Sequence, residues 1–152
     1  MDRVVVEIFI ITITFNNCLG LKRTIESVLS TITLNSLIQE IVIIDNMSLD
    51  GTLDVIENIQ RVSTIPINYL RDPDEGIYDA MNKGARWAKH EYLLMLNSGD
   101  ELLSDIKYED LKAVPRLPDI IAFGCEYKLS RKSLKLLPRQ FTGADPKMPS
   151  LH

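Results

Sequence analysis

Apolar, largely β-branched segments alternate along the chain with segments whose apolar residues recur every three or four positions. The first kind of segment is typical of buried strands and the second of amphipathic helices. The pattern predicts strands at residues 4–14, 40–45, 65–70, 91–97 and 119–125, and a second extended piece at 126–137. It predicts helices at residues 19–31, at a stretch after Ser48 or Asp50 that carries Leu53, Ile56 and Ile59, and at residues 76–89.

Strands of this kind, separated by helices, favour an α/β fold. Near-continuous apolar strands are typical of a mostly parallel central sheet with helices on both faces. Because crossovers between parallel strands are right-handed, the loops that follow the strands all lie at one edge of the sheet. Open α/β sheets bind their ligands at that edge, so the residues after each strand are the first candidates for a functional site.

Composition narrows the class of protein further. A chain of 152 residues is about the size of one domain, and its formal net charge of −4 argues against a nucleic-acid partner. The apolar run that ends at Phe15 is too short for a membrane span, and no signal peptide precedes it, which favours a cytoplasmic protein. Cys18 and Cys125 lie far apart and are expected to be free thiols, although one disulfide stays an alternative.

Polar and acidic residues follow each of the first four predicted strands. These strand ends read Thr14-Phe-Asn-Asn17, Asp45-Asn-Met-Ser48, Arg71-Asp-Pro-Asp-Glu-Gly76 and Asn97-Ser-Gly-Asp-Glu101. A single acidic strand end is usually a turn or a helix cap, but four that converge on one edge indicate a site. The sequence contains no GxGxxG dinucleotide motif, no P-loop and no GxSxG elbow.

In this order, the four segments resemble family 2 glycosyltransferases of the GT-A, Rossmann-like fold, and in particular the bacterial subgroup that builds O-antigen and other surface polysaccharides. The resemblance runs from about residue 8 to residue 103. It also includes Asp79-Ala-Met-Asn82-Lys-Gly84 in the third predicted helix. It implies transfer of a sugar from a nucleotide-sugar, with UDP as the expected nucleotide, to a saccharide or lipid-linked acceptor.

The resemblance also implies roles for individual residues in the donor site. Asp45 would accept a hydrogen bond from the nucleotide base, its alternative being a turn carboxylate that caps the next helix. Thr14, Phe15 and Asn16 would line the nucleoside pocket, the alternative for Phe15 being a place in the core. The residues implied for the rest of the donor site are Asp79, Asn82 and, pairing with phosphate or base, Arg71. Asp50 is expected to cap a helix, and Gly84 to permit close packing of helix on sheet.

Asn97-Ser-Gly-Asp100 stands where the family carries its Asp-x-Asp motif. The resemblance therefore implies a Mg²⁺ or Mn²⁺ ion on the donor diphosphate, with Asp100 as ligand and Glu101 as a helper. Hard cations of this kind prefer oxygen ligands. This chain has Asn97 at the first acidic position of the motif, so one carboxylate carries the site. The alternative is an Asx turn at the end of the strand.

The domain expected from the resemblance has two parts. Residues 1–103 would bind the nucleotide-sugar, and residues 104–152 would begin an acceptor-binding part that stops short. No residue is assigned as the catalytic base: Glu126 and Asp145 qualify by residue type alone, and His152 is expected to be structural. Peripheral membrane association would follow from a lipid-linked acceptor.

Two other functions remain open at this stage. One is a catalytically inert fragment that binds the nucleotide without transferring sugar. The other is a nucleotidyltransferase, which would need a basic, glycine-rich phosphate loop that the stretch from Thr14 to Gly20 lacks.

Overall fold

A computed structural model describes residues 7–31, 37–89 and 92–103, together with the backbone of residues 125–129 and 132–136. The chain divides into two compact units, Met1–Ala113 and Val114–His152. None of the helices in the described residues is long and apolar enough to cross a membrane.

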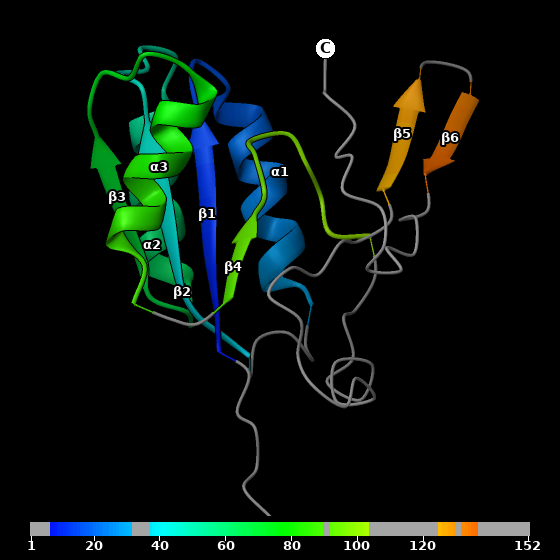
Figure 1. Cartoon of the computed structure of the whole chain (residues 1–152), viewed down its shortest axis with the longest axis horizontal. Helices are drawn as coiled ribbons and strands as arrows, with labels where there is room; N and C mark the ends of the chain where they lie inside the picture. The colour runs from blue at the N-terminus through cyan, green and yellow to red at the C-terminus, as the bar shows by residue number, and fades with distance from the viewer. Residues whose placement is uncertain (1–6, 32–36, 90–91, 104–124, 130–131, 137–152) are drawn as a thin grey trace, which may run out of the picture. The chain divides into compact units, whose positions relative to one another are not determined.

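The first unit is built on a four-stranded parallel sheet, in the strand order β3-β2-β1-β4 (Figure 1). The strands are β1 (Ile8–Thr14), β2 (Ile38–Asp45), β3 (Ile67–Arg71) and β4 (Tyr92–Met95). Past Met95 the chain continues alongside β1, because Ser98 N donates to Ile13 O at 3.0 Å. The predicted strands are confirmed within the described residues, although residues 4–6 and 91 lie outside them.

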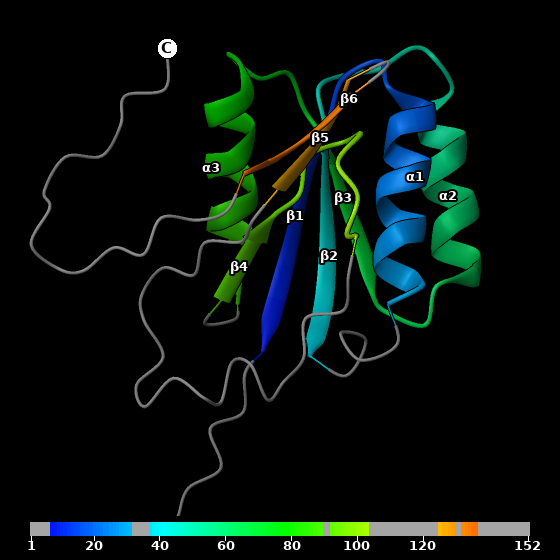
Figure 2. The same ribbon diagram turned by 90° about the vertical axis from the view of Figure 1, so that its right-hand side faces the viewer.

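Helices cover both faces of this sheet, as the sequence predicts. Figure 2 shows α1 (Cys18–Leu29) and α2 (Thr52–Val62) on one face and α3 (Ile77–Trp87) on the other. Asn17 begins α1 by accepting a hydrogen bond from Gly20 N at 3.1 Å. Two glycines with positive φ, Gly51 at 88° and Gly76 at 127°, precede α2 and α3, a backbone conformation that side chains disfavour.

The core lies on both faces of the two central strands because successive strand residues point to opposite faces. On the α3 face, Phe9, Ile11, Val42 and Ile44 pack with Ala80, and Trp87 packs against that cluster. The helix approaches the sheet closely there: a Cβ added at Gly84 would lie 2.5 Å from Ile11 Cγ2. The packing role predicted for Gly84 is confirmed. The buried residues that alternate with these on the strands belong to the α1 and α2 face: Ile8, Ile10, Ile41 and Ile43.

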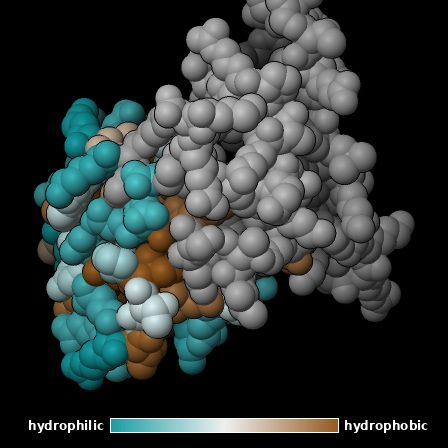
Figure 3. Space-filling model, turned by 90° about the horizontal axis from the view of Figure 1, so that it is seen from below, coloured by the Kyte–Doolittle hydropathy of each residue, from teal (hydrophilic) through white to brown (hydrophobic). Residues whose placement is uncertain are grey.

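The sheet differs in polarity between the end at which its strands begin and the end at which they finish. Figure 3 views the first unit from below, the end at which the strands of Figure 1 begin, and shows an apolar area among hydrophilic residues. The polar network described below lies at the opposite edge, where the strands end. The polar side chains therefore gather where the strands end.

The described part of the second unit is an antiparallel hairpin, in which β5 (Cys125–Leu129) pairs with β6 (Lys132–Leu136). The prediction of one extended piece over residues 126–137 is wrong, because two paired strands occupy this stretch. No glycine, proline or asparagine marks the reversal in the sequence. Alternation of apolar and polar residues continues on both sides of it, so pattern alone could not locate it. The predicted strand at 119–125 lies outside the described residues, apart from Cys125.

Candidate nucleotide-binding site

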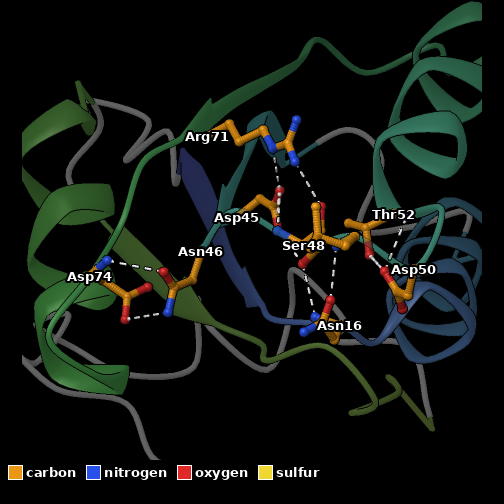
Figure 4. A network of polar contacts seen from close by, with 9 residues as sticks. Asn16, Asp45, Asn46, Ser48, Asp50, Thr52, Arg71 and Asp74 are labelled. Carbon is orange, nitrogen blue, oxygen red and sulfur yellow. Dashed lines mark hydrogen bonds and ion pairs between the residues drawn. The ribbon is translucent and has the colours of Figure 1, made fainter.

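Three candidate residues form a row across the carboxyl ends of neighbouring strands. The register places Thr14 of β1 beside Asp45 of β2, and Asp45 beside Arg71 of β3. Since neighbours in register share a face of the sheet, all three side chains lie on the face that α1 and α2 cover. Figure 4 shows Asp45 and Arg71 of this row together with the loop that follows β2. Residues predicted separately from three strand ends therefore meet in one place.

Asp45 is the buried centre of the row, with 1% of its surface exposed. Its carboxylate accepts from Ser48 N, at 3.2 Å from each oxygen, and Ser48 Oγ donates a short hydrogen bond to Oδ1. Arg71 Nε lies 3.3 Å from Oδ2 and forms an ion pair, while Arg71 Nη2 donates to Ser48 O at 2.7 Å. The carboxylate therefore braces the turn after β2 and holds Arg71 beside it.

Thr14 and Phe15 present a polar and an aromatic group at the end of β1. The Thr14 side chain is 5% exposed, and its hydroxyl has no hydrogen-bond partner among the described residues. The Phe15 side chain is 61% exposed, so the alternative that places it in the core is wrong. An exposed aromatic ring can pack against a nucleotide base, and an unsatisfied hydroxyl can hydrogen-bond a ligand.

Asn16 ties the end of β1 to the loop after β2. Its backbone has a φ of 45°, a left-handed conformation that asparagine tolerates better than most residues. Asn16 N donates to Ser48 Oγ at 2.8 Å, and Asn16 Oδ1 accepts from Leu49 N at 2.9 Å. The pocket role predicted for this side chain is untested, but the contacts give it a structural role that local sequence did not reveal.

Asp50 joins the first turns of two helices. Its carboxylate accepts from Thr52 Oγ1 at 2.5 Å and Thr52 N at 3.2 Å, which confirms the predicted cap on α2. It also accepts from Cys18 N at 2.8 Å, in the first turn of α1. The bond from the Thr52 hydroxyl, followed by that from Cys18 N, lowers the pKa of Asp50 from 3.8 to about 2. The carboxylate is thus the anion that both helix ends hold.

We expect Asp50 to stabilise the fold above pH 4 and to lose that contribution in acid. Because its pKa is lower in the folded chain than in the unfolded chain, the stabilisation disappears as pH falls from 3.8 towards 2. The difference in melting temperature between wild type and Asp50→Asn should be constant above pH 5 and vanish near pH 2. Asp54→Asn controls for the loss of a carboxylate from the first turn of α2. A difference that persisted unchanged to pH 2 would contradict the assignment.

The loop between β3 and α3 is held by charged groups. Lys83 Nζ lies 2.5 Å from Asp72 Oδ2 and 3.4 Å from Asp79 Oδ2, and also donates to Pro73 O. The bond to Asp72 raises the pKa of Lys83, and the backbone N–H of Glu75 lowers that of Asp79. Asp79 therefore accepts from the backbone just before α3, while Asn82 is exposed one turn further along the helix. Their predicted contacts with donor are untested.

A second clasp links this loop to the loop after β2. Asn46 Nδ2 donates to Asp74 Oδ1 at 3.2 Å, and Asp74 N donates back to Asn46 Oδ1 at 3.1 Å (Figure 4). Such reciprocal pairing fixes two loops that lie 28 residues apart in the sequence. The carboxyl edge of the sheet is accordingly cross-linked from β1 to α3.

The candidate metal loop follows β4 and rests on α1. Thr24 Oγ1 accepts from Gly99 N at 2.9 Å, and Asn17 Nδ2 donates to Ser98 O at 3.1 Å. Asp100 is exposed, and its Oδ2 accepts from Asn97 N at 3.3 Å. Asp100 N donates to Asn97 O at 2.9 Å, so a backbone turn forms here; the Asx turn named as the alternative does not, because Gly99 N donates to Thr24 and not to Asn97 Oδ1. An exposed carboxylate in such a turn can still face a ligand.

The oxygen donors in this loop suit a hard cation but do not enclose one. Asp100 offers a carboxylate, and Asn97 Oδ1 is buried without a hydrogen-bond partner among the described residues. Glu101 pairs with Arg23 at 3.6 Å. No group of three acidic, histidine or cysteine side chains in the described residues could hold a metal. An ion here would depend on oxygens that a ligand brings.

Several predicted residues lie outside the described side chains. Glu126 belongs to β5, of which only the backbone is described. Asp145 and His152 lie outside the described residues. Cys18 is a free thiol, as predicted. Sequence reasoning missed Thr24 and Asn17 as supports of the metal loop, because their partners are more than 70 residues away.

The fold and the row of polar side chains define an α/β protein with a ligand site at the carboxyl edge of its sheet. The family profile described as Glycosyl transferase family 2 matches residues 9–133, and the chain belongs to that family. The resemblance stated from the four strand-end segments is thus confirmed at the level of the family.

Curated relatives are similar over part of their length. The chain is 36% identical over 107 residues to poly(ribitol-phosphate) β-N-acetylglucosaminyltransferase TarP of Staphylococcus aureus, covering 69% of this chain and 32% of TarP. It is 38% identical over 63 residues to a PGL/p-HBAD biosynthesis glycosyltransferase of Mycobacterium tuberculosis, covering 41% of this chain and 25% of the relative. The chain spans a third or less of these relatives.

Solved structures show the same fold. The mannosyltransferase PcManGT of Pyrobaculum calidifontis, in complex with GDP-Man and Mn²⁺, superimposes with a TM-score of 0.60 at 16% identity, covering 64% of this chain and 29% of that one. S. aureus TarS in complex with UDP gives a TM-score of 0.57 at 20% identity, over 70% of this chain and 31% of that one. The expected GT-A fold is therefore confirmed.

Proposed function

We propose that the protein binds a UDP-sugar at the row Thr14, Asp45 and Arg71 and transfers the sugar to a saccharide or lipid-linked acceptor. The observation that carries the proposal is the convergence, at one edge of the sheet, of a buried carboxylate, an unsatisfied hydroxyl and an exposed aromatic ring. Membership of the glycosyltransferase family supports it. Relatives of this fold are solved with UDP, UDP-GlcNAc and GDP-Man.

Each member of the row suits a different part of a uridine. The Phe15 ring offers a face for the base, and the Thr14 hydroxyl offers a hydrogen bond that no other described residue takes up. Asp45 would accept the ring N–H that uracil has and cytosine lacks. Only 1% of Asp45 is exposed, so this contact requires the Arg71 side chain, which is 31% exposed, to move away from Asp45. Asp79 and Asn82 would face the donor from α3.

A divalent cation, Mg²⁺ or Mn²⁺, would complete the donor site. Asp100 and Asn97 would hold it through hard oxygen atoms, with the donor diphosphate supplying further ligands. Such an ion would neutralise the negative charge on the departing nucleoside diphosphate. The Mn²⁺ in the PcManGT complex, on the same fold, supports this part of the proposal.

The acceptor is proposed from chemistry and from the relatives' names. TarP is named for a poly(ribitol-phosphate), and the mycobacterial relative for the biosynthesis of PGL and p-HBAD. These names support an acceptor in surface polysaccharide or glycolipid synthesis, of the O-antigen kind. A lipid-linked acceptor would place the reaction in the cytoplasm at the inner face of the membrane, with peripheral association of the enzyme.

Thermal unfolding with nucleotides tests the donor half of the proposal. With Mn²⁺ present, 1 mM UDP should raise the melting temperature by about 3–10 °C if the dissociation constant lies at about 10–100 μM. CDP should raise it less, because cytosine lacks the ring N–H. Guanosine and adenosine diphosphates serve as further comparisons. No rise with any nucleoside diphosphate would overturn the proposal.

Transfer is tested separately from binding. The full chain is incubated with UDP-GlcNAc and Mn²⁺, and the release of UDP is followed with and without saccharide and lipid-linked acceptors. UDP release that depends on acceptor supports a transferase. Binding of UDP without hydrolysis or transfer under every condition would favour the inert nucleotide-binding fragment instead.

A further inference from the structure

We propose that Ser48 is a positioning residue of the nucleotide site. Its hydroxyl holds Asp45, the proposed acceptor for the base, and the loop that carries Phe15 in one arrangement. The proposal rests on the proposed function, because it assigns Ser48 a role in the binding of UDP. Ser48 contacts the two loops and the strand end that build the site.

The direction of the Ser48 hydroxyl is determined by its two partners. Its Oγ lies 2.8 Å from Asn16 N and within a short hydrogen bond of Asp45 Oδ1. The backbone N–H of Asn16 can only donate, and an ionised carboxylate can only accept. The hydroxyl proton therefore points to Asp45, and an oxygen lone pair receives the Asn16 N–H. Ser48 is 4% exposed, so both bonds are largely shielded from solvent.

The backbone of Ser48 completes the same arrangement. Ser48 N lies 3.2 Å from both oxygens of Asp45, which sets the plane of the carboxylate against the turn. Ser48 O accepts from Arg71 Nη2 at 2.7 Å, so the guanidinium is held on the far side of Asp45. Ser48 thereby orients the Asp45 carboxylate and holds the Arg71 guanidinium beside it.

The contact with Asn16 links Ser48 to the loop that carries Phe15. Asn16 adopts a φ of 45°, and Phe15, which precedes it, is 61% exposed with no core packing to hold it. The hydrogen bond from Asn16 N to Ser48 Oγ joins residues 32 positions apart. Without it, one of the two bonds that tie the β1–α1 loop to the β2–α2 loop through Asn16 is lost, the other being Leu49 N to Asn16 Oδ1.

Replacing Ser48 by alanine removes both hydroxyl bonds and leaves a buried carboxylate oxygen and a backbone N–H with fewer partners. We expect Ser48→Ala to weaken UDP binding by about 10-fold or more. Binding of CDP, which does not use the ring N–H contact, should fall less, so the UDP-to-CDP affinity ratio should drop. Ser48→Thr keeps a hydroxyl and should recover most of the UDP affinity.

Ser63→Ala is the matched control. Ser63 Oγ also makes two hydrogen bonds, donating to Ile65 O at 2.7 Å and accepting from Ile65 N at 3.1 Å, but it lies at the other end of α2. Calorimetric titration of UDP and CDP, with Mn²⁺ and below the melting transition of every variant, compares the four proteins. A purely structural role would lower the melting temperature of Ser48→Ala and Ser63→Ala without changing the affinity ratio.

The outcomes separate the two proposals. If wild type prefers UDP and Ser48→Ala alone loses that preference, Ser48 is a positioning residue. If wild type prefers UDP and Ser48→Ala keeps both affinity and preference, the proposal for Ser48 is wrong while the proposed function stands. If wild type binds no nucleoside diphosphate, the proposed function fails and the role of Ser48 fails with it.

Discussion

Asp45→Asn is expected to weaken UDP binding by about 100-fold and to lower the free energy of unfolding by about 1–3 kcal/mol. The substitution keeps the shape of the side chain and removes its charge. An asparagine can still accept from Ser48 through Oδ1, but its amide group would face Arg71 Nε, which lies 3.3 Å from Asp45 Oδ2. Two donors would then oppose each other where an ion pair stands now.

The two effects have different sources. Loss of UDP affinity follows from the loss of an anionic acceptor for the uracil N–H, a hydrogen bond that gains strength from the charge. Loss of stability follows because a carboxylate that is 1% exposed leaves its partners unpaired when it is replaced. The stability effect is kept below that of a fully buried pair, since Arg71 remains 31% exposed to water.

Asp54→Asn makes the same chemical change at an exposed position in the first turn of α2. We expect it to leave UDP affinity unchanged and to shift stability by less than about 1 kcal/mol. Urea unfolding and calorimetric titration measure both quantities for both variants. Equal UDP affinity in wild type and Asp45→Asn would contradict the assignment of Asp45 to the base.

Phe9→Ala is expected to lower the free energy of unfolding by about 3–5 kcal/mol, the largest stability effect we predict for the chain. Phe9 is fully buried on β1, in the cluster that α3 covers. Removing the ring leaves a cavity between the sheet and the helix. The close approach at Gly84 limits how far the helix can move to fill that cavity.

Phe15→Ala is the matched substitution just past the other end of β1. Because its side chain is 61% exposed, we expect stability to change by less than about 0.5 kcal/mol, while UDP affinity falls. Urea midpoints for the two variants, with UDP titrations of each below its own transition, test this contrast. A large loss of stability in Phe15→Ala, or a negligible one in Phe9→Ala, would be inconsistent with the core as described.

Much of the fold follows from local pattern. The four strands and three helices of the first unit, and the meeting of their polar ends at one edge, were predictable because burial selects residues with a fixed period. The cap that Asp50 places on α2 was also predictable, because its partner Thr52 is only two residues away in the sequence. The hairpin at 125–136 was not, because no glycine, proline or asparagine marks its reversal.

The sequence by itself determined the class of fold, the edge of the sheet at which polar side chains meet and which residues gather there. Only the tertiary structure decided how those residues pair. Arg71, proposed from sequence as a ligand for phosphate or base, is held by Asp45 and Ser48, and Asn16 is bound to the loop after β2. The reason is physical: periodicity reports which residues are buried, whereas a hydrogen bond depends on which loops fold back against each other. The partners named here lie between 23 and 32 residues apart.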